Sequence, residues 1–257
     1  MTPTDIDREE LLRYRMSDTE QLRTSDILRL LPAGCASALD VGARDGHFSR
    51  LLAQRMPSVT ALDLEMPSID DPRIRCVQGD VTRMQFADDA FDLVVCTEVL
   101  EHIDPDALDR ACSELTRVSG KHLLVGVPYR QDIRVGRTTC CHCGAGNPPW
   151  GHRSAFDDDR LRGLFPNLHP IEVSYVGVNW ESTNAVARVL LDLAGNPYGT
   201  YGQDEVCVGC GGALRERPPR NFPRKGLSKA GHLARRLTER FQPAHANWIH
   251  ILFEKRR

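Results

Sequence analysis

This chain of 257 residues lacks the long apolar runs of a membrane protein. None of its runs approaches the roughly 20 residues that a membrane-spanning helix needs. The acids Asp5, Asp7 and Glu9 are also unlike the start of a secretory signal peptide. We therefore expect a soluble, cytoplasmic protein without a membrane span.

An excess of charge of either sign is missing as well. The chain has 33 basic and 35 acidic residues, so its net charge argues neither for nor against a nucleic-acid partner. The distribution is less even, because residues 215–240 hold nine basic residues and two acids. One interpretation is a solvated helix over 227–241 that packs through Leu233, Leu237 and Phe241. The other is a docking surface for an anionic glycan or for nucleic acid.

Short apolar runs alternate with amphipathic segments along most of the chain. Strands are expected at 38–41, 59–63, 73–78, 91–96, 122–128, 171–178 and 246–254. Helices are expected at 5–31, 47–53, 105–118, 157–164 and 185–193. Alternation at these lengths predicts an α/β fold with a doubly wound, mostly parallel seven-stranded sheet and helices on both faces.

The first strand ends in a turn rich in glycine, from Asp40 to Gly46. Gly42 and Gly46 permit the tight or left-handed backbone of a turn that cradles a ligand, and the next helix starts directly after Gly46. A dinucleotide site would require G-x-G-x-x-G, which fails here because Arg44 stands between the two glycines. The turn is therefore the expected position of a different cofactor.

Acids follow the later strands in the same way. Asp63 comes 23 residues after Asp40, at the end of the second strand, and Asp80 and Glu98 follow the third and fourth strands. Ligands of such sheets bind beyond the carboxyl ends of the strands, where an acid at the tip of the second strand accepts hydrogen bonds from ribose hydroxyls.

Together these motifs resemble the class I S-adenosylmethionine-dependent methyltransferases. The resemblance covers residues 22–128 and the last strand. It implies that the glycine turn holds the methionine part of the cofactor, that Asp63 binds the ribose, and that Asp80 and Val81 flank the adenine. The expected cofactor-binding residues are Asp40, Gly42, Arg44, Gly46, Asp63, Leu64, Asp80, Val81, Thr97 and Glu98. Arg44 departs from the family, which most often has glycine there, and its guanidinium points either toward the cofactor carboxylate or to solvent.

The implied reaction is methyl transfer to a small molecule or glycan, with oxygen as the favoured acceptor atom. Transfer from a sulfonium needs mainly positioning of the acceptor, but an oxygen acceptor usually also needs a base. His102, next to the end of the fourth strand, and His152 are the candidates, and each also has a purely structural interpretation. The alternatives are a nucleic-acid methyltransferase, which is less favoured, and a non-catalytic binding module that retains the fold.

Two pairs of cysteines have the spacing of metal knuckles. Cys140 and Cys143 form one C-x-x-C pair and Cys207 and Cys210 form the other, each among glycines. Four thiolates satisfy a structural, tetrahedral zinc ion, and Cys141 or His142 would substitute if the first knuckle were shifted.

The zinc site suggests a division of the chain. We expect an N-terminal helical segment over 1–36 and a methyltransferase domain over 37–257. Insertions at 136–152 and 180–245 would form a zinc-bound cap that shapes the acceptor site.

Overall fold

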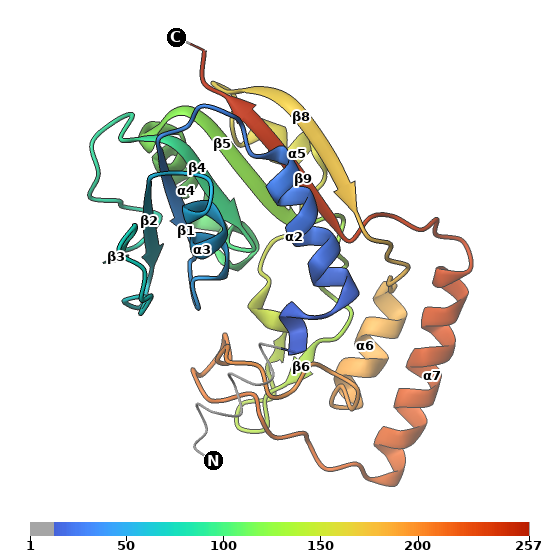
Figure 1. Ribbon diagram of the computed structural model, residues 1–257. Helices are drawn as coiled ribbons and strands as arrows, with labels where there is room; N and C mark the ends of the chain where they lie inside the picture. Colours follow the sequence, from blue (N-terminus) through green and yellow to red (C-terminus); the bar gives the residue numbers. More distant parts are fainter. Residues whose placement is uncertain (1–12, 257) are drawn as a thin grey trace.

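Seven strands form the central sheet of this computed structural model, in which residues 13–256 are described (Figure 1). The strands are β1 (Ser37–Val41), β2 (Ser58–Asp63), β3 (Ile74–Gln78), β4 (Phe91–Thr97), β5 (Ser119–Pro128), β8 (His169–Val176) and β9 (Trp248–Glu254). Their spatial order is β3-β2-β1-β4-β5-β9-β8, with β1 to β5 parallel and β9 antiparallel to both of its neighbours. The predicted fold class and all seven strands are confirmed, although β8 begins and ends two residues before the expected 171–178.

The register of the parallel strands brings their carboxyl ends to one edge of the sheet. Val41, the last residue of β1, lies opposite Leu62 in β2 and Cys96 in β4. The chain leaves all three strands within one or two residues of these positions. The glycine turn, Asp63 and Glu98 therefore follow neighbouring strand ends, as expected for a sheet of this topology.

Helices cover both faces of the sheet with apolar side chains. On one face lie α2 (Asp18–Leu30) and α3 (His47–Ala53), and on the other α4 (Pro105–Val118) and α5 (Asp158–Gly163). Asp104 caps α4 by accepting a hydrogen bond from the N–H of Asp106. The helix expected at 105–118 is confirmed, and its apolar side chains at helical spacing are buried: Leu108, Ala111, Cys112, Leu115 and Val118.

The N-terminal segment is described only from residue 13, so residues 5–12 of the expected helix lie outside the described part of the chain. Ile27 and Leu30 of α2 are buried, but Leu22 is 58% exposed. The buried face instead includes Glu20 and Arg23, which form a two-pronged ion pair with both N···O distances at 2.8 Å. A carboxylate and a guanidinium paired in this way can occupy an interior position that neither could occupy alone.

Two insertions lie outside the sheet. The first holds the short strands β6 (Thr138–Thr139) and β7 (Gly146–Asn147), and the second holds the helices α6 (Ala185–Leu193) and α7 (Phe222–Glu239). Figure 1 shows α6 and α7 side by side and away from the sheet. Among the described residues, no helix is long and apolar enough to cross a membrane.

The prediction that the basic helix, α7, packs through Leu233, Leu237 and Phe241 is wrong. Leu233, Leu237 and Phe241 are 64%, 64% and 81% exposed. The helix instead approaches α6 through Gly231, where an added Cβ would lie 2.8 Å from a Leu191 side-chain carbon. A small residue at the crossing allows close backbone approach, and this turns the leucines toward solvent.

A buried contact joins α2 to the end of the chain. Asp26 in α2 lies 2.7 Å from Nδ1 of the fully buried His250 in β9, and it accepts a hydrogen bond from Ser174 in β8 at 2.8 Å. Burial raises the pKa of Asp26, but the hydrogen bonds from His250, Ser174 and Arg29 outweigh this effect and lower the pKa to about 2.

We expect Asp26→Asn to destabilise the protein by on the order of 1–2 kcal/mol at pH 7. A lowered folded-state pKa gives stability that is fully present above the unfolded value near 4 and is lost as the pH falls toward about 2. Urea unfolding between pH 7 and pH 3 should therefore show a steeper loss for the wild type than for the variant. Parallel curves would contradict the assignment.

Candidate functional site

The glycine turn after β1 has the tight geometry that its sequence predicts. Gly42 and Gly46 have φ angles of +78° and +76°, a region that favours glycine. An added Cβ would lie 2.4 Å from Val99 Cγ2 at Gly42 and 2.5 Å from Ile69 Cδ1 at Gly46. Both positions therefore require glycine, because the φ angle is left-handed and because there is no room for a Cβ atom.

The acids of β1 and β2 have different environments. Asp40 is buried and accepts a hydrogen bond from Ser49 Oγ at 2.5 Å, and burial raises its pKa to about 6. This contact ties the end of β1 to α3. Asp63 is half-buried and accepts the backbone N–H of Arg44 at 2.8 Å, so its carboxylate faces the glycine turn.

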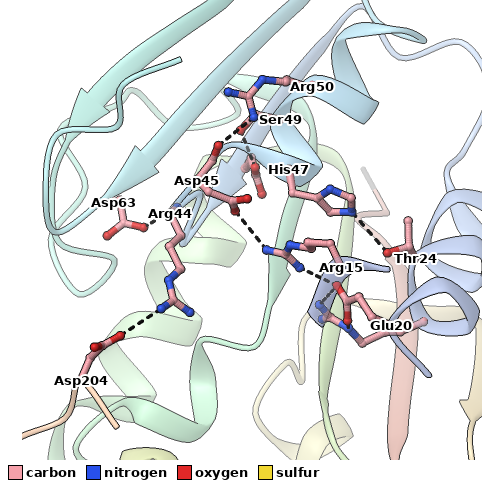
Figure 2. Close-up of polar contacts among 12 residues, drawn as sticks. Arg15, Glu20, Thr24, Arg44, Asp45, His47, Ser49, Arg50, Asp63 and Asp204 are labelled. Atoms are coloured by element: carbon pink, nitrogen blue, oxygen red, sulfur yellow. Dashed lines mark hydrogen bonds and ion pairs between the residues drawn. The ribbon is translucent and has the colours of Figure 1, made fainter. Parts of the chain in front are cut away.

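The side chain of Arg44 contacts the second insertion. Its guanidinium lies 3.1 Å from Asp204 Oδ2, and both side chains are largely exposed (Figure 2). Arg44 also has a φ angle of +45°, which is uncommon for a residue with a side chain. The sequence alone left its direction open, and the structure turns it toward Asp204.

The N-terminal segment reaches the same turn, as Figure 2 shows. Arg15 lies 3.0 Å from Asp45 Oδ1, and Thr24 Oγ1 lies 3.4 Å from His47 Nε2. These contacts place residues 13–30 of the N-terminal segment against the loop and helix start that follow β1.

The remaining expected cofactor residues lie at the ends of β2, β3 and β4. Leu64 and Asp80 are exposed, with Asp80 accepting the N–H of Thr82 at 2.8 Å, whereas Val81 and Thr97 are buried. Glu98 has a φ angle of +57°, and its Oε1 is buried without a hydrogen-bond partner. Strain and an unsatisfied polar atom at one residue are typical of functional sites.

The two candidate histidines lie together. The rings of His102 and His152 are 4.7 Å apart between centroids. His152 Nδ1 lies 2.5 Å from Gln131 Oε1, and His102 Nδ1 lies 3.5 Å from Glu205 Oε1. Burial and the neighbouring His102 lower the pKa of His152 to about 3, so its ring is neutral at pH 7 and a weak proton acceptor.

Sequence reasoning missed Glu101, which lies against this histidine pair. Its side chain is fully buried, and both carboxylate oxygens lack a hydrogen-bond partner. Burial, with the nearby charge of Glu98, raises its pKa well above the usual range. The run Glu98-Val99-Leu100-Glu101-His102 was the available signal, because a tight turn after a strand brings such residues to one place.

With this geometry established, comparison with known proteins identifies the fold. Residues 39–123 match the family model described as a methyltransferase domain. The N-methyltransferase NodS from Bradyrhizobium japonicum, solved with S-adenosyl-L-homocysteine, aligns over 95% of this chain and 91% of its own, at 15% identity and a TM-score of 0.53. The fold is that of the class I methyltransferases.

Curated relatives are also similar at the level of sequence. The ubiquinone biosynthesis O-methyltransferase of Xanthomonas axonopodis pv. citri is 38% identical over 107 residues, which is 37% of this chain and 44% of that protein. The chain therefore matches less than half of that relative. The methyltransferase fold also occurs in the [4+2]-cyclase SpnF, which aligns over 93% of this chain and 84% of its own, at 14% identity and a TM-score of 0.53.

The cysteine cluster lies beyond the matched part of the methyltransferase fold, which ends at residue 123. The sulfurs of Cys140, Cys143, Cys207 and Cys210 all lie within 4.8 Å of one another. Cys140 and Cys210 are 3.7 Å apart, and Cys143 and Cys207 are 3.5 Å apart. These separations exceed a disulfide bond and are near the edge of about 3.8 Å of a tetrahedral zinc–thiolate site.

The two knuckles have the same backbone pattern. Cys140 donates its N–H to Ala145 and Cys207 donates its N–H to Gly212, each five residues ahead. Gly144 and Gly211 follow the second cysteine of each pair with φ angles of +75° and +70°. The structure thus brings together the four cysteines that the sequence analysis grouped. Cys141 and His142, the possible substitutes, are exposed and lie outside the group.

A cavity of about 240 Å³ lies between the loop after β5 and the two insertions. Its lining residues are Gln131, Asp132, Val135, Gly136, Pro149, Trp150, Asn179, Glu181 and Thr200. Gln131 connects this cavity to the histidine pair, because its side chain contacts His152.

We expect Gly42→Ala to lower stability more than Gly34→Ala. Both glycines have a φ angle of +78°, so both substitutions carry the left-handed penalty of about 1–2 kcal/mol. Nothing lies within 4 Å of a Cβ at Gly34, whereas the Cβ at Gly42 collides with Val99, which adds about 1–3 kcal/mol. Urea denaturation of the pair measures the difference, and equal losses would contradict the close approach of Val99.

Proposed function

We propose that this protein transfers a methyl group from S-adenosylmethionine to a hydroxyl of a small molecule. The observation that carries the proposal is Asp63, which stands at the end of β2 and faces the glycine turn through the N–H of Arg44. The sequence similarity to an O-methyltransferase supports oxygen as the acceptor atom.

The residues present fit the cofactor. Glu98 supplies a buried carboxylate oxygen without a hydrogen-bond partner, which suits a donor such as an amine, although Arg23 Nη1 lies 3.9 Å away. Asp40, Asp63 and Glu98 gather negative charge at one edge of the sheet, which favours a positively charged sulfonium ligand. The bound cofactor would supply an activated methyl group whose sulfur is a good leaving group.

The protein's own part in this reaction is to bind, orient and exclude water. In our proposal Asp63 accepts hydrogen bonds from ribose hydroxyls, and the glycine turn admits the amino-acid end close to the backbone. Asp80 and Val81 flank the base, and Leu64, Thr97 and Glu98 complete the cleft. Arg44 closes the turn by its pair with Asp204 rather than by contacting the cofactor.

The acceptor would reach the site from the cavity beside the insertions. The cavity lies next to the histidine pair through Gln131 and is lined by the carboxylates of Asp132 and Glu181. Its size and polar lining suit a small hydroxylated molecule, including a sugar unit of a glycan.

A structural zinc ion in the cysteine cluster would hold the two insertions together as a cap, and it forms part of this proposal. Asn147 from the first insertion supports the arrangement, because its side chain accepts the N–H of Val208 at 2.8 Å. In the same proposal the catalytic domain spans residues 37–257 and follows an N-terminal segment that is described from residue 13. Residues 136–152 and 180–245 form the cap.

We expect Asp63→Ala to weaken binding of S-adenosylhomocysteine by about ten- to a hundredfold, the cost of losing hydrogen bonds to a charged group. Calorimetric titration measures this affinity, and Asp70→Ala, which removes an exposed acid from the loop after β2, serves as the control. Incubation with methyl-labelled cofactor and pools of phenols and sugars then tests transfer. Tight binding without labelling of any acceptor would favour a non-catalytic module, and salt-sensitive labelling of RNA or DNA would favour a nucleic-acid substrate.

We expect the wild type to hold about one more zinc ion per purified chain than Cys207→Ser, measured by elemental analysis, and the variant to have a lower midpoint of thermal unfolding. Cys141→Ser is the matched control, because this exposed cysteine adjoins the cluster without joining it. Equal zinc content in Cys207→Ser and the wild type, or a loss of zinc in Cys141→Ser, would overturn the assigned ligands.

A further inference from the structure

Three side chains outside the cysteine cluster converge at the end of β4. One ligand atom each from Glu101, His102 and His152 lies within 4.8 Å of the others. We infer that these residues form a binding site for a divalent cation of the first transition series. This assignment differs from the cysteine cluster in position and in ligand chemistry, since it offers one carboxylate and two imidazoles.

The buried carboxylate of Glu101 is the strongest observation for the site. The side chain has 0% exposure, and neither of its oxygens has a hydrogen-bond partner. An ionised carboxylate that is buried without partners is costly, so such groups in proteins are protonated, paired with a cation or bound to a metal, and even a protonated carboxyl needs hydrogen-bond partners. The nearest buried guanidinium, that of Arg23, is directed to Glu20 and lies 3.9 Å from Glu98.

The two histidines are oriented as ligands. The side-chain oxygen of Gln131 lies 2.5 Å from Nδ1 of His152 and accepts a hydrogen bond from it. The ring proton is therefore on Nδ1, and Nε2 keeps its lone pair. Glu205 lies 3.5 Å from Nδ1 of His102 and would hold that ring in the same way. Such outer partners fix the tautomer and the direction of metal-binding imidazoles.

The composition of the site decides which ion it would take. A carboxylate with two imidazoles is typical of Mn²⁺, Fe²⁺, Co²⁺ or Zn²⁺, and three protein ligands leave positions open for water or a substrate oxygen. Four thiolates, by contrast, form a closed site that selects zinc. Mn²⁺ is therefore a selective probe, because it favours oxygen and nitrogen ligands over thiolates.

The role of the site rests on the proposed methyl transfer, whereas ion binding does not. A cation here would lower the pKa of an acceptor hydroxyl, which would release its proton to solvent. The acceptor oxygen would then form a bond to the methyl carbon while the carbon–sulfur bond breaks and sulfur keeps the electron pair. Both histidines would serve as ligands, and no protein base would be required.

Titration of the purified chain with Mn²⁺, followed by the electron paramagnetic resonance of the free ion, tests the site without cofactor or acceptor. We expect one Mn²⁺ per chain. Glu101→Gln, which keeps the side-chain shape, and His102→Asn, at a half-exposed position, should each weaken binding by about a hundredfold or more. Gln131→Ala should weaken it by about ten- to a hundredfold, because it removes only an orienting partner.

His122→Asn is the control, since this histidine lies on β5 outside the cluster. No stoichiometric Mn²⁺ binding by the wild type, or binding that survives in Glu101→Gln and His102→Asn, would overturn the site. Circular dichroism of each variant separates loss of the ion from loss of the fold. Because the measurement contains no methyl donor, its outcome is independent of whether the protein proves to be a methyltransferase.

Discussion

The site depends on the parallel pairing of β1 with β2 and β4. Because Val41 lies opposite Leu62 and Cys96, three strands end side by side, and each is followed by its own polar loop. The hydrogen-bond register thus brings the loops after β1, β2 and β4, which are far apart in the sequence, to one edge of the sheet. A shift of one residue in either pairing would turn Asp63 or Glu98 to the other face of the sheet.

Much of this arrangement could be predicted from the sequence because its signals are local. An apolar run such as that of β4 identifies a strand, and the glycines at 42 and 46 identify a turn, without knowledge of the rest of the chain. The knuckle geometry is local as well, so the four cysteines could be grouped even though 63 residues separate Cys143 from Cys207.

The errors share a different cause. Burial of Glu101 and the pairing of Arg44 with Asp204 depend on segments far apart in the sequence, which no periodic pattern reports. Amphipathic spacing misplaced Leu233 in the same way. The pattern shows that a helix has an apolar face, but the close contact at Gly231 decides which face packs. The environments of Glu101 and Arg44 are therefore set by tertiary contacts that the local sequence does not indicate.

The order of the strands has a consequence for synthesis of the chain. β9 is the last strand in the described sequence, yet it lies between β5 and β8 in the sheet. On the ribosome, about 70 further residues must follow β8 before β9, its neighbour among the described strands, emerges. All four cysteines precede β9, so the knuckles can meet while that strand is still unmade. The two insertions can thus come together on a nascent half-sheet, before β9 inserts between β5 and β8.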